Sequence, residues 1–280
     1  METTVEQSFD TNWKVTEEAL YTHWTYGEPS NQIQLAFRKH WEVFQELMRS
    51  PHFNQGKRCL EVGCGRGSIS SYFSNSGFDC VLLDISYHVL TLARNIFNRH
   101  SLPASFSVGD AYRLQFFNNS FDVVVSIGLL EHFEDVDKII EEQVRVLDKG
   151  GLFLGYVVPK YEHNIQKDYE WIVEILKIYV NNQKKPIEKI PVYRSDNNSS
   201  HYIPLLKKYG LKNVQASGIY PLPMISNSIE FPFTLMHPEA EKILVSSFET
   251  MLEERSQKSV IHPWLCKEGY GQAFLLWGYK

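Results

Sequence analysis

The chain has 280 residues, of which 43% are hydrophobic and 22% are charged, with a formal net charge of −5. This composition excludes global disorder and indicates a soluble globular protein, large enough to form one elaborated domain. Its basic residues form only short clusters such as Lys184-Lys185. The sequence therefore predicts no surface for a phosphate backbone, and we expect no nucleic-acid partner.

The cysteines and the amino terminus point to an intracellular location. The four cysteines, at positions 59, 64, 80 and 266, form no CxxC pair, which is typical of reduced thiols, and we expect no metal site. Residues 1–10 are acidic and polar, unlike a signal peptide, and no segment approaches the roughly 18 apolar residues of a membrane span. We therefore expect a cytoplasmic protein that does not span a membrane.

Strands and helices are predicted to alternate through the first 160 residues. Apolar residues spaced by three and four from Ile33 to Met48 predict an amphipathic helix that Pro51 ends. Strands are predicted at 58–62, 80–84, 104–108, 121–127 and 152–158, and helices at about 66–75, 89–97 and 136–147, the last closed by Gly150-Gly151. This alternation predicts an α/β fold, a doubly wound sheet with helices on both faces.

The pattern changes after Pro159. An aromatic-rich helix is predicted around 169–179, followed by a polar stretch at 181–200, a helix at 202–209, a strand at 211–219, a helix at 238–255 and a strand at 272–279. We interpret residues 1–54 as N-terminal cap helices, 55–158 as the core and 159–204 as a cap insertion. Residues 205–280 then complete the core, with a second insertion at 220–237.

Three glycines follow the first predicted strand at alternate positions, Gly63, Gly65 and Gly67. Such a turn suits positive φ angles and lets a ligand approach the backbone at the carboxyl edge of a parallel sheet. A dinucleotide fingerprint requires its third glycine at position 68, where this chain has Ser68. Glu61 lies inside the strand, where a cationic or N–H-bearing ligand would offset the cost of burying its carboxylate.

Further motifs lie after the next three predicted strands: Asp84, Asp110 in "GDA", and "IGLLEHF" at 127–133, with "LDKGG" at 147–151 closing the following helix. Together with the turn they resemble the motifs of the class I S-adenosylmethionine-dependent methyltransferases over residues 55–158. The resemblance implies S-adenosylmethionine as cofactor. It also implies a Rossmann-like mixed sheet of seven strands, the last antiparallel, with an α-helical cap.

The resemblance assigns a part of the cofactor to each motif. Glu61, Gly63, Cys64, Gly65 and Gly67 would hold its amino acid part. The ribose hydroxyls would bind Asp84, and Ile85 would lie beside them. The negative charge of Asp84 would repel the 2′-phosphate of NADP. The adenine would meet Asp110 and Ala111, and Ile127 and Gly128 would lie near the methyl group.

The catalytic assignment has alternatives. His132 is a candidate general base, although a role in positioning its loop fits the resemblance equally well. Tyr21, Trp24 and Tyr26 either pack a cap, or one of them closes over the sulfonium, where an aromatic face is worth about 0.5–2 kcal/mol. His23 could act there as a base.

We expect methyl transfer to an oxygen or nitrogen nucleophile of a small, partly apolar molecule, because aromatic residues are abundant in the predicted caps. The protein would be a monomer or a homodimer. An NAD-dependent reductase or epimerase and a non-catalytic S-adenosylmethionine-binding protein are the alternatives. Methylation of protein or nucleic acid is disfavoured, because the chain has no basic groove and no N-P-P-Y motif after the fourth strand.

Overall fold

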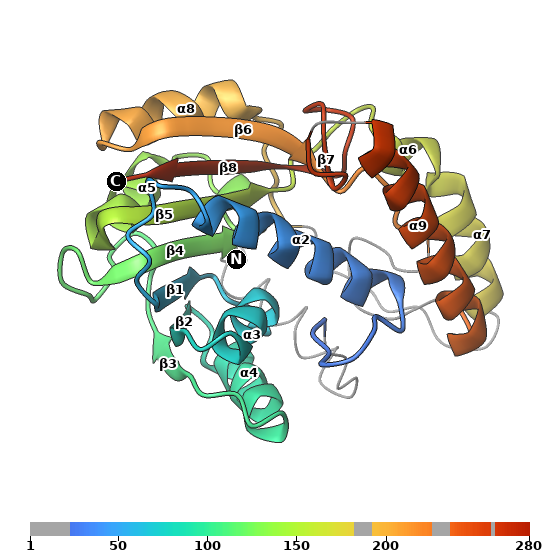
Figure 1. Cartoon of the computed structure of the whole chain (residues 1–280), viewed down its shortest axis with the longest axis horizontal. Coiled ribbons are helices and arrows are strands. Elements are labelled where there is room, and N and C mark those ends of the chain that lie inside the picture. The colour runs from blue at the N-terminus through green and yellow to red at the C-terminus, as the bar shows by residue number, and fades with distance from the viewer. Residues whose placement is uncertain (1–22, 182–191, 226–235, 259–260) are drawn as a thin grey trace, which may run out of the picture.

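A computed structural model of the chain describes residues 23–181, 192–225, 236–258 and 261–280. They form one central sheet with the strand order β3-β2-β1-β4-β5-β8-β6-β7 (Figure 1). The strands are β1 (Arg58–Val62), β2 (Asp79–Asp84), β3 (Ser105–Val108), β4 (Phe121–Ile127), β5 (Leu147–Val157), β6 (Lys212–Ile219), β7 (Leu265–Cys266) and β8 (Ala273–Tyr279). The first five are mutually parallel, and β8 runs antiparallel to β5 and β6.

Helices cover both faces of the sheet. One apolar core lies under α2 (Gln32–Met48), α3 (Ser68–Asn75) and α4 (Tyr87–Arg99), and a second lies under α5 (Asp137–Val146) and α8 (Ser199–Lys208). Val123, Val124 and Val125 of β4 are fully buried, which explains the unbroken β-branched run in this strand. The predicted doubly wound α/β fold and the antiparallel last strand are confirmed.

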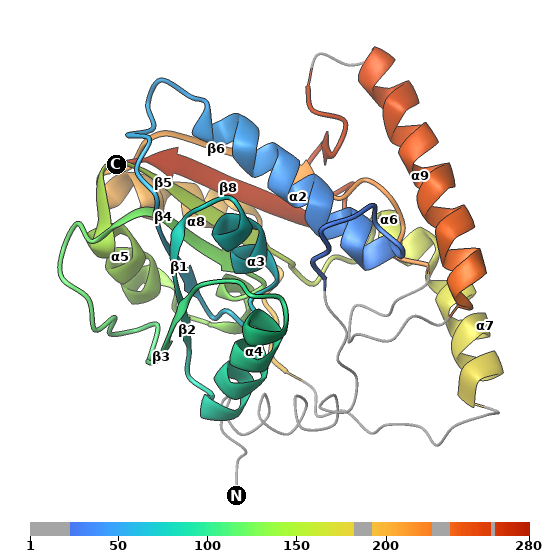
Figure 2. The same cartoon turned by 60° about the horizontal axis from the view of Figure 1, so that its bottom comes forward.

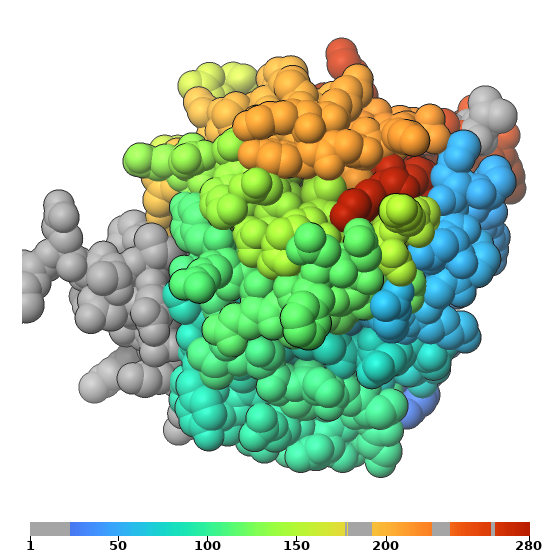
Figure 3. All heavy atoms as spheres, turned by 90° about the vertical axis from the view of Figure 1, so that its left-hand side faces the viewer, coloured from blue at the N-terminus to red at the C-terminus, as the bar shows by residue number. Residues whose placement is uncertain are grey.

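Three helices gather beyond the carboxyl ends of the parallel strands: α6 (Ile165–Asp168), α7 (Glu170–Asn181) and α9 (Pro238–Lys258). Figures 1 and 2 both draw α7 and α9 side by side, apart from the sheet. Figure 3 faces the opposite, amino-terminal edge, where the red end of β8 lies between orange α8 and β6 and the light-blue end of α2. Within the described ranges, no helix has the length and apolar character needed to cross a membrane.

Two expected boundaries and the expected number of strands are wrong. The helix α3 begins at Ser68 and not at Arg66, because Gly67 has a left-handed backbone, with φ of 71°, at its N-cap. The strand β5 begins at Leu147, directly after α5, so that Gly150 and Gly151 lie inside it and not in a turn before it. The sheet has an eighth strand, β7, which is too short for its pattern to be recognised in the sequence.

The helix α2 is packed onto the sheet. Its Leu35 and Phe44 are almost completely buried and share a core with Val123 of β4. The division of the chain into a cap at 1–54, a core at 55–158 and later insertions stays a prediction.

Candidate cofactor and active site

The glycine turn follows β1 at the carboxyl edge of the sheet. Gly63, Gly65 and Gly67 all have positive φ angles, of 68°, 52° and 71°. A Cβ at Gly63 would lie 2.6 Å from the Leu129 Cδ1, and one at Gly67 would lie 2.4 Å from the Leu82 Cδ2. The positive φ favours glycine at both positions, and at Gly67 the buried Leu82 also leaves little room for a Cβ.

Asp84, at the end of β2, is bonded to this turn. Its Oδ2 accepts the backbone N–H of Gly65 at 3.0 Å, and its Oδ1 accepts the N–H of Ser86 at 3.0 Å. Its backbone oxygen accepts the N–H of Gly109 after β3, also at 3.0 Å. Asp84 thus joins the carboxyl ends of three neighbouring strands, where a carboxylate can also accept hydrogen bonds from a sugar diol.

Glu61 lies beneath the turn and is 2% exposed. Its Oε2 accepts the backbone N–H of Ser70 at 3.1 Å, which fixes the first turn of α3 against β1. Burial raises the pKa of the Glu61 carboxyl to about 8, and the hydrogen bonds from Ser70 oppose this shift. In this state Glu61 is largely protonated at neutral pH, unlike the ionised carboxylate that the sequence suggested.

The residues expected near the ribose and the adenine lie beside Asp84. Ile85 has 44% of its surface exposed, whereas Ala111 is 9% exposed. The Oδ1 of Asp110 accepts the N–H of Tyr112 at 2.9 Å, and its backbone oxygen accepts the N–H of Arg113 at 3.0 Å. Asp110 therefore shapes the loop after β3, and its binding role stays a prediction.

On the other side of β1, Ile127 ends β4 and Gly128 follows it with φ of 66°. The Gly128 N–H donates to the backbone oxygen of Tyr156 in β5 at 2.9 Å. His132 comes next, in the short 3₁₀ helix η1 (Leu130–His132). Burial lowers the pKa of its imidazole to about 4.

The tautomer of His132 follows from its partner. Its Nδ1 lies 2.7 Å from the backbone oxygen of Tyr193, and a carbonyl oxygen only accepts, so Nδ1 carries the proton. The neutral ring then has its lone pair on Nε2. A base oriented through its other nitrogen is the arrangement expected of a catalytic histidine.

His23 lies next to the helix that follows the glycine turn. Its Nδ1 is 2.8 Å from the Ser68 Oγ, and its ring stacks on Phe37 with centroids 4.8 Å apart. Burial, and secondarily the charge of Arg66, lower the pKa of His23 to about 3. It is therefore a neutral group at the site, while Tyr21 lies outside the described residues.

Tyr26 is placed away from the glycine turn. Its hydroxyl donates to the backbone oxygen of His100 at 3.2 Å, beyond the C-terminal end of α4, and its ring meets Trp24 edge to face. The side chain is 66% exposed. This hydrogen bond ties Tyr26 to the C-terminal end of α4, and a role of Tyr26 in binding the cofactor stays a prediction.

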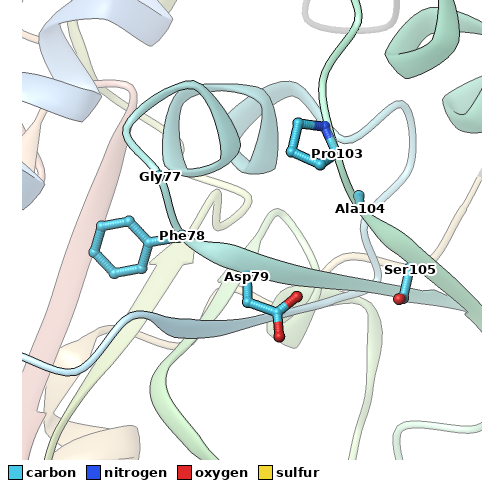
Figure 4. A pocket seen from close by; sticks show the side chains of 6 residues that line it. All are labelled: Gly77, Phe78, Asp79, Pro103, Ala104 and Ser105. Atoms are coloured by element: carbon cyan, nitrogen blue, oxygen red, sulfur yellow. The ribbon is translucent and has the colours of Figure 1, made fainter.

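A pocket of about 480 Å³ lies elsewhere, between the starts of β2 and β3 (Figure 4). Its lining residues are Gly77, Phe78, Asp79, Pro103, Ala104 and Ser105. This is the amino-terminal edge of the parallel strands, opposite the glycine turn, so we do not regard it as the cofactor site. In the described part of the chain, no group of three His, Cys, Asp or Glu side chains could hold a metal ion.

Two buried residues near the site were missed in the sequence. His40 belongs to the amphipathic helix α2, whose pattern marks its apolar residues and not a buried histidine. Trp264 comes directly before β7, the strand that was not predicted. The Trp264 Nε1–H donates to the His40 Nδ1 at 2.8 Å, although the two residues are 224 positions apart. No local sequence pattern signals such a pair.

Known proteins share the same architecture. A methyltransferase-domain family model matches residues 60–155. The phthiotriol/phenolphthiotriol dimycocerosates methyltransferase of Mycobacterium leprae is 32% identical over 49% of this chain and 52% of its own. Norajmaline N-methyltransferase of Rauvolfia serpentina is 32% identical over 38% of this chain and 37% of its own. A Haloferax volcanii methyltransferase-type protein, solved with the Trm112 activator, has a TM-score of 0.56 at 20% identity, over 99% of this chain and 97% of its own.

The likeness to the solved structure shows a shared fold, whereas the family model covers only the methyltransferase domain. The chain spans about half the length, or less, of these two curated relatives. The matched segment contains the glycine turn, Asp84, Asp110 and His132, that is, the residues that converge at the carboxyl edge of the sheet. Residues 60–155 of the chain thus form a methyltransferase domain, similar to that of the class I S-adenosylmethionine-dependent methyltransferases.

Proposed function

We propose that the protein transfers a methyl group from S-adenosylmethionine to an oxygen or nitrogen atom of a small, partly apolar molecule. The observation that carries the proposal is the junction at Asp84, whose side chain bonds the glycine turn while its backbone bonds the end of β3. The methyltransferase relatives support a small-molecule acceptor, since one of them is named for phthiotriol dimycocerosates and another for norajmaline.

The residues present fit the cofactor. Gly63, Gly65 and Gly67 hold the turn at positive φ angles that let a ligand approach its backbone, and the exposed Ile85 offers an apolar surface beside Asp84. In the proposed site Asp84 binds the ribose, Asp110 and Ala111 bind the adenine, and Glu61 with Gly63, Cys64, Gly65 and Gly67 supports the amino acid part. Ile127 and Gly128 lie toward the reacting end.

The chain itself would orient the acceptor, exclude water and accept a proton. When bound, S-adenosylmethionine supplies an electrophilic methyl group on a sulfonium. His132 is neutral at physiological pH because burial lowers its pKa to about 4, so its Nε2 can take a proton from a hydroxyl or an amine. Holding the acceptor in line with the methyl group is the larger contribution in such a reaction.

The test is methyl transfer itself. The purified protein is incubated with S-adenosylmethionine and sets of small phenols, carboxylic acids and amines, and S-adenosylhomocysteine is quantified by mass spectrometry. We expect acceptor-dependent release of S-adenosylhomocysteine that the Asp84→Asn variant does not support. Tight cofactor binding with no transfer to any acceptor would instead favour a non-catalytic S-adenosylmethionine-binding protein.

A further inference from the structure

Helix α2 covers one face of the sheet (Figure 1), and four aromatic rings surround His40 of this helix. The ring of His40 meets those of Phe37, Tyr156, Tyr220 and Trp264 edge to face, with centroids 4.8 to 6.0 Å apart. We call these five residues the His40 cluster. They come from α2, β5, the segment after β6 and the segment before β7, so the fold assembles them from distant parts of the chain.

The cluster lies next to the residues proposed to line the cofactor. Tyr156 is the register partner of Ile127 in the neighbouring strand. The backbone oxygen of Tyr156 accepts the N–H of Gly128. At the other end, Phe37 stacks on His23, which is bonded to Ser68 at the start of α3. The His40 cluster therefore lies beside the reacting end of the proposed cofactor site.

The partner of His40 fixes its chemical character. The Trp264 indole N–H only donates, so the His40 Nδ1 must accept and the neutral ring carries its proton on Nε2. Protonation of Nδ1 would break this buried bond, and burial lowers the pKa of His40 to about 3. His40 is thus a permanently neutral group whose Nε2–H donates a hydrogen bond.

Two polar atoms of the cluster have no partner in the ranges that the structure describes. His40 is 3% exposed and Tyr156 is 7% exposed, yet neither the His40 Nε2 nor the Tyr156 hydroxyl makes a hydrogen bond to those residues. Neither atom is completely enclosed, so a bound molecule can reach both donors. The two donors belong to adjoining rings, whose centroids are 4.8 Å apart.

The cluster is held rigidly. Tyr220 is 2% exposed and has φ of 63°, a left-handed conformation that is rare for a bulky residue. Its N–H donates to the Trp264 backbone oxygen and its own oxygen accepts from Gln272 N–H, both at 3.2 Å, while its ring stacks on Trp264 at 4.6 Å. Such a conformation persists only where the surroundings impose it, and it occurs preferentially at functional sites.

We propose that His40 and Tyr156 bind the methyl acceptor, and that they select a flat apolar ring bearing an oxygen, such as a phenol, an enol or a ring carbonyl. The inference rests on the proposed function, because it assigns the second substrate of the same reaction. The surrounding rings suit the flat body of this acceptor, and the two donors suit its oxygen. The nitrogen lone pair of an aromatic amine is delocalised into the ring, so such an amine is a poor acceptor and would leave the His40 N–H unpaired.

The test uses protein saturated with S-adenosylhomocysteine and three naphthalene probes of nearly equal shape. These are 2-naphthol, 2-aminonaphthalene and 2-methylnaphthalene, with affinities measured by fluorescence titration. We expect 2-naphthol to bind at least ~10-fold more tightly than the other two, the ratio expected for one well-made hydrogen bond to an oxygen. Equal affinity for the three probes, or no binding of 2-naphthol, would overturn the inference.

Variants locate the binding site. Tyr156→Phe and His40→Gln should each weaken 2-naphthol binding ~5- to 10-fold and leave 2-methylnaphthalene unaffected. Tyr202→Phe is the matched control, since Tyr202 is a buried tyrosine on the opposite face of the sheet. If Tyr156→Phe behaves like this control, Tyr156 does not bind the acceptor and the inference fails.

A spectroscopic measurement tests the role of Trp264, a positioning residue. In ¹⁵N-histidine NMR spectra, His40 should show a protonated Nε2 from pH 5 to 8, and Trp264→Phe should shift the tautomer populations. A His40 ring protonated at Nδ1 in the wild type would contradict the assignment.

Titration with S-adenosylhomocysteine distinguishes the failure of this inference from the failure of the proposed function. Absence of cofactor binding refutes the proposed function, whereas normal cofactor binding without selection for oxygen refutes only this inference.

Discussion

The Asp84 carboxylate accepts the backbone N–H of Gly65 at 3.0 Å, which joins the end of β2 to the turn after β1. The same side chain accepts from Ser86 at the start of α4. An acid that is already fixed by two backbone donors does not need to reorganise when it binds a ribose diol. The structure thus links the shape of the glycine turn to the group expected to anchor the cofactor.

Gly63→Ala should abolish cofactor binding and lower stability. The new Cβ would lie 2.6 Å from the Leu129 Cδ1 in addition to the strain of φ at 68°. Together these effects cost about 2–4 kcal/mol. Gly77→Ala is the matched control, because it has φ of 79° and no contact closer than 3.7 Å. Thermal unfolding and S-adenosylhomocysteine titration should separate the two variants, and equal behaviour would refute the steric argument.

Cofactor binding should release a proton from Glu61. Burial raises the pKa of this carboxyl to about 8, so it is mostly neutral at pH 7, and a bound ammonium nearby would favour its ionised form. Calorimetry in buffers of different ionisation enthalpy should detect up to about one proton released per cofactor at pH 7. Glu61→Gln should release none, and an unchanged proton count in this variant would contradict the role of Glu61.

Glu131→Gln should stabilise the protein at high pH. Burial raises the pKa of this carboxyl to about 7, and backbone hydrogen bonds from Glu131 and Val158 oppose the shift only in part. Because the folded pKa lies above the unfolded value, Glu131 contributes most stability below pH 4.5 and loses it as the pH rises through 7.

Urea unfolding at pH 5 and pH 8 tests this prediction. Relative to the wild type, Glu131→Gln should gain on the order of 1–3 kcal/mol between the two pH values. Glu134→Gln changes an exposed carboxylate of the same loop and should gain nothing. If the wild type loses no stability relative to Glu131→Gln between pH 5 and pH 8, the pKa of the Glu131 carboxyl is not raised by burial, and the prediction is contradicted.

His132→Gln should reduce turnover much more than cofactor affinity. Removing a general base typically costs a factor of about 10²–10⁴ in rate, whereas the His132 ring is not among the groups proposed to hold the cofactor. The measurements are kcat with an acceptor found in the transfer screen and the Kd for S-adenosylhomocysteine. Comparable losses in both would assign His132 to positioning the loop that Tyr193 contacts.

Local patterns predicted the parts of the fold and site that depend on local chemistry. The glycines at 63, 65 and 67 need positive φ, and the strand ends at Asp84 and Ile127 follow from short apolar runs. The His40 cluster could not be predicted in this way, because the Trp264–His40 bond depends on how α2 packs against the end of the chain. The hydrogen bond of Tyr26 could not be predicted for a related reason: its partner is a backbone oxygen, of which the sequence gives no sign.

The most direct test of the account is calorimetric titration with S-adenosylhomocysteine. The wild type should bind one equivalent and show no binding of NADH. Asp84→Asn should weaken this binding ~10- to 100-fold, because it replaces a charged acceptor of the ribose hydroxyls. Asp148→Asn, the same change at an acid that binds Arg58 on the opposite edge of the sheet, should leave affinity unchanged. Tight binding of S-adenosylhomocysteine by Asp84→Asn, or none by the wild type, would contradict the proposed site.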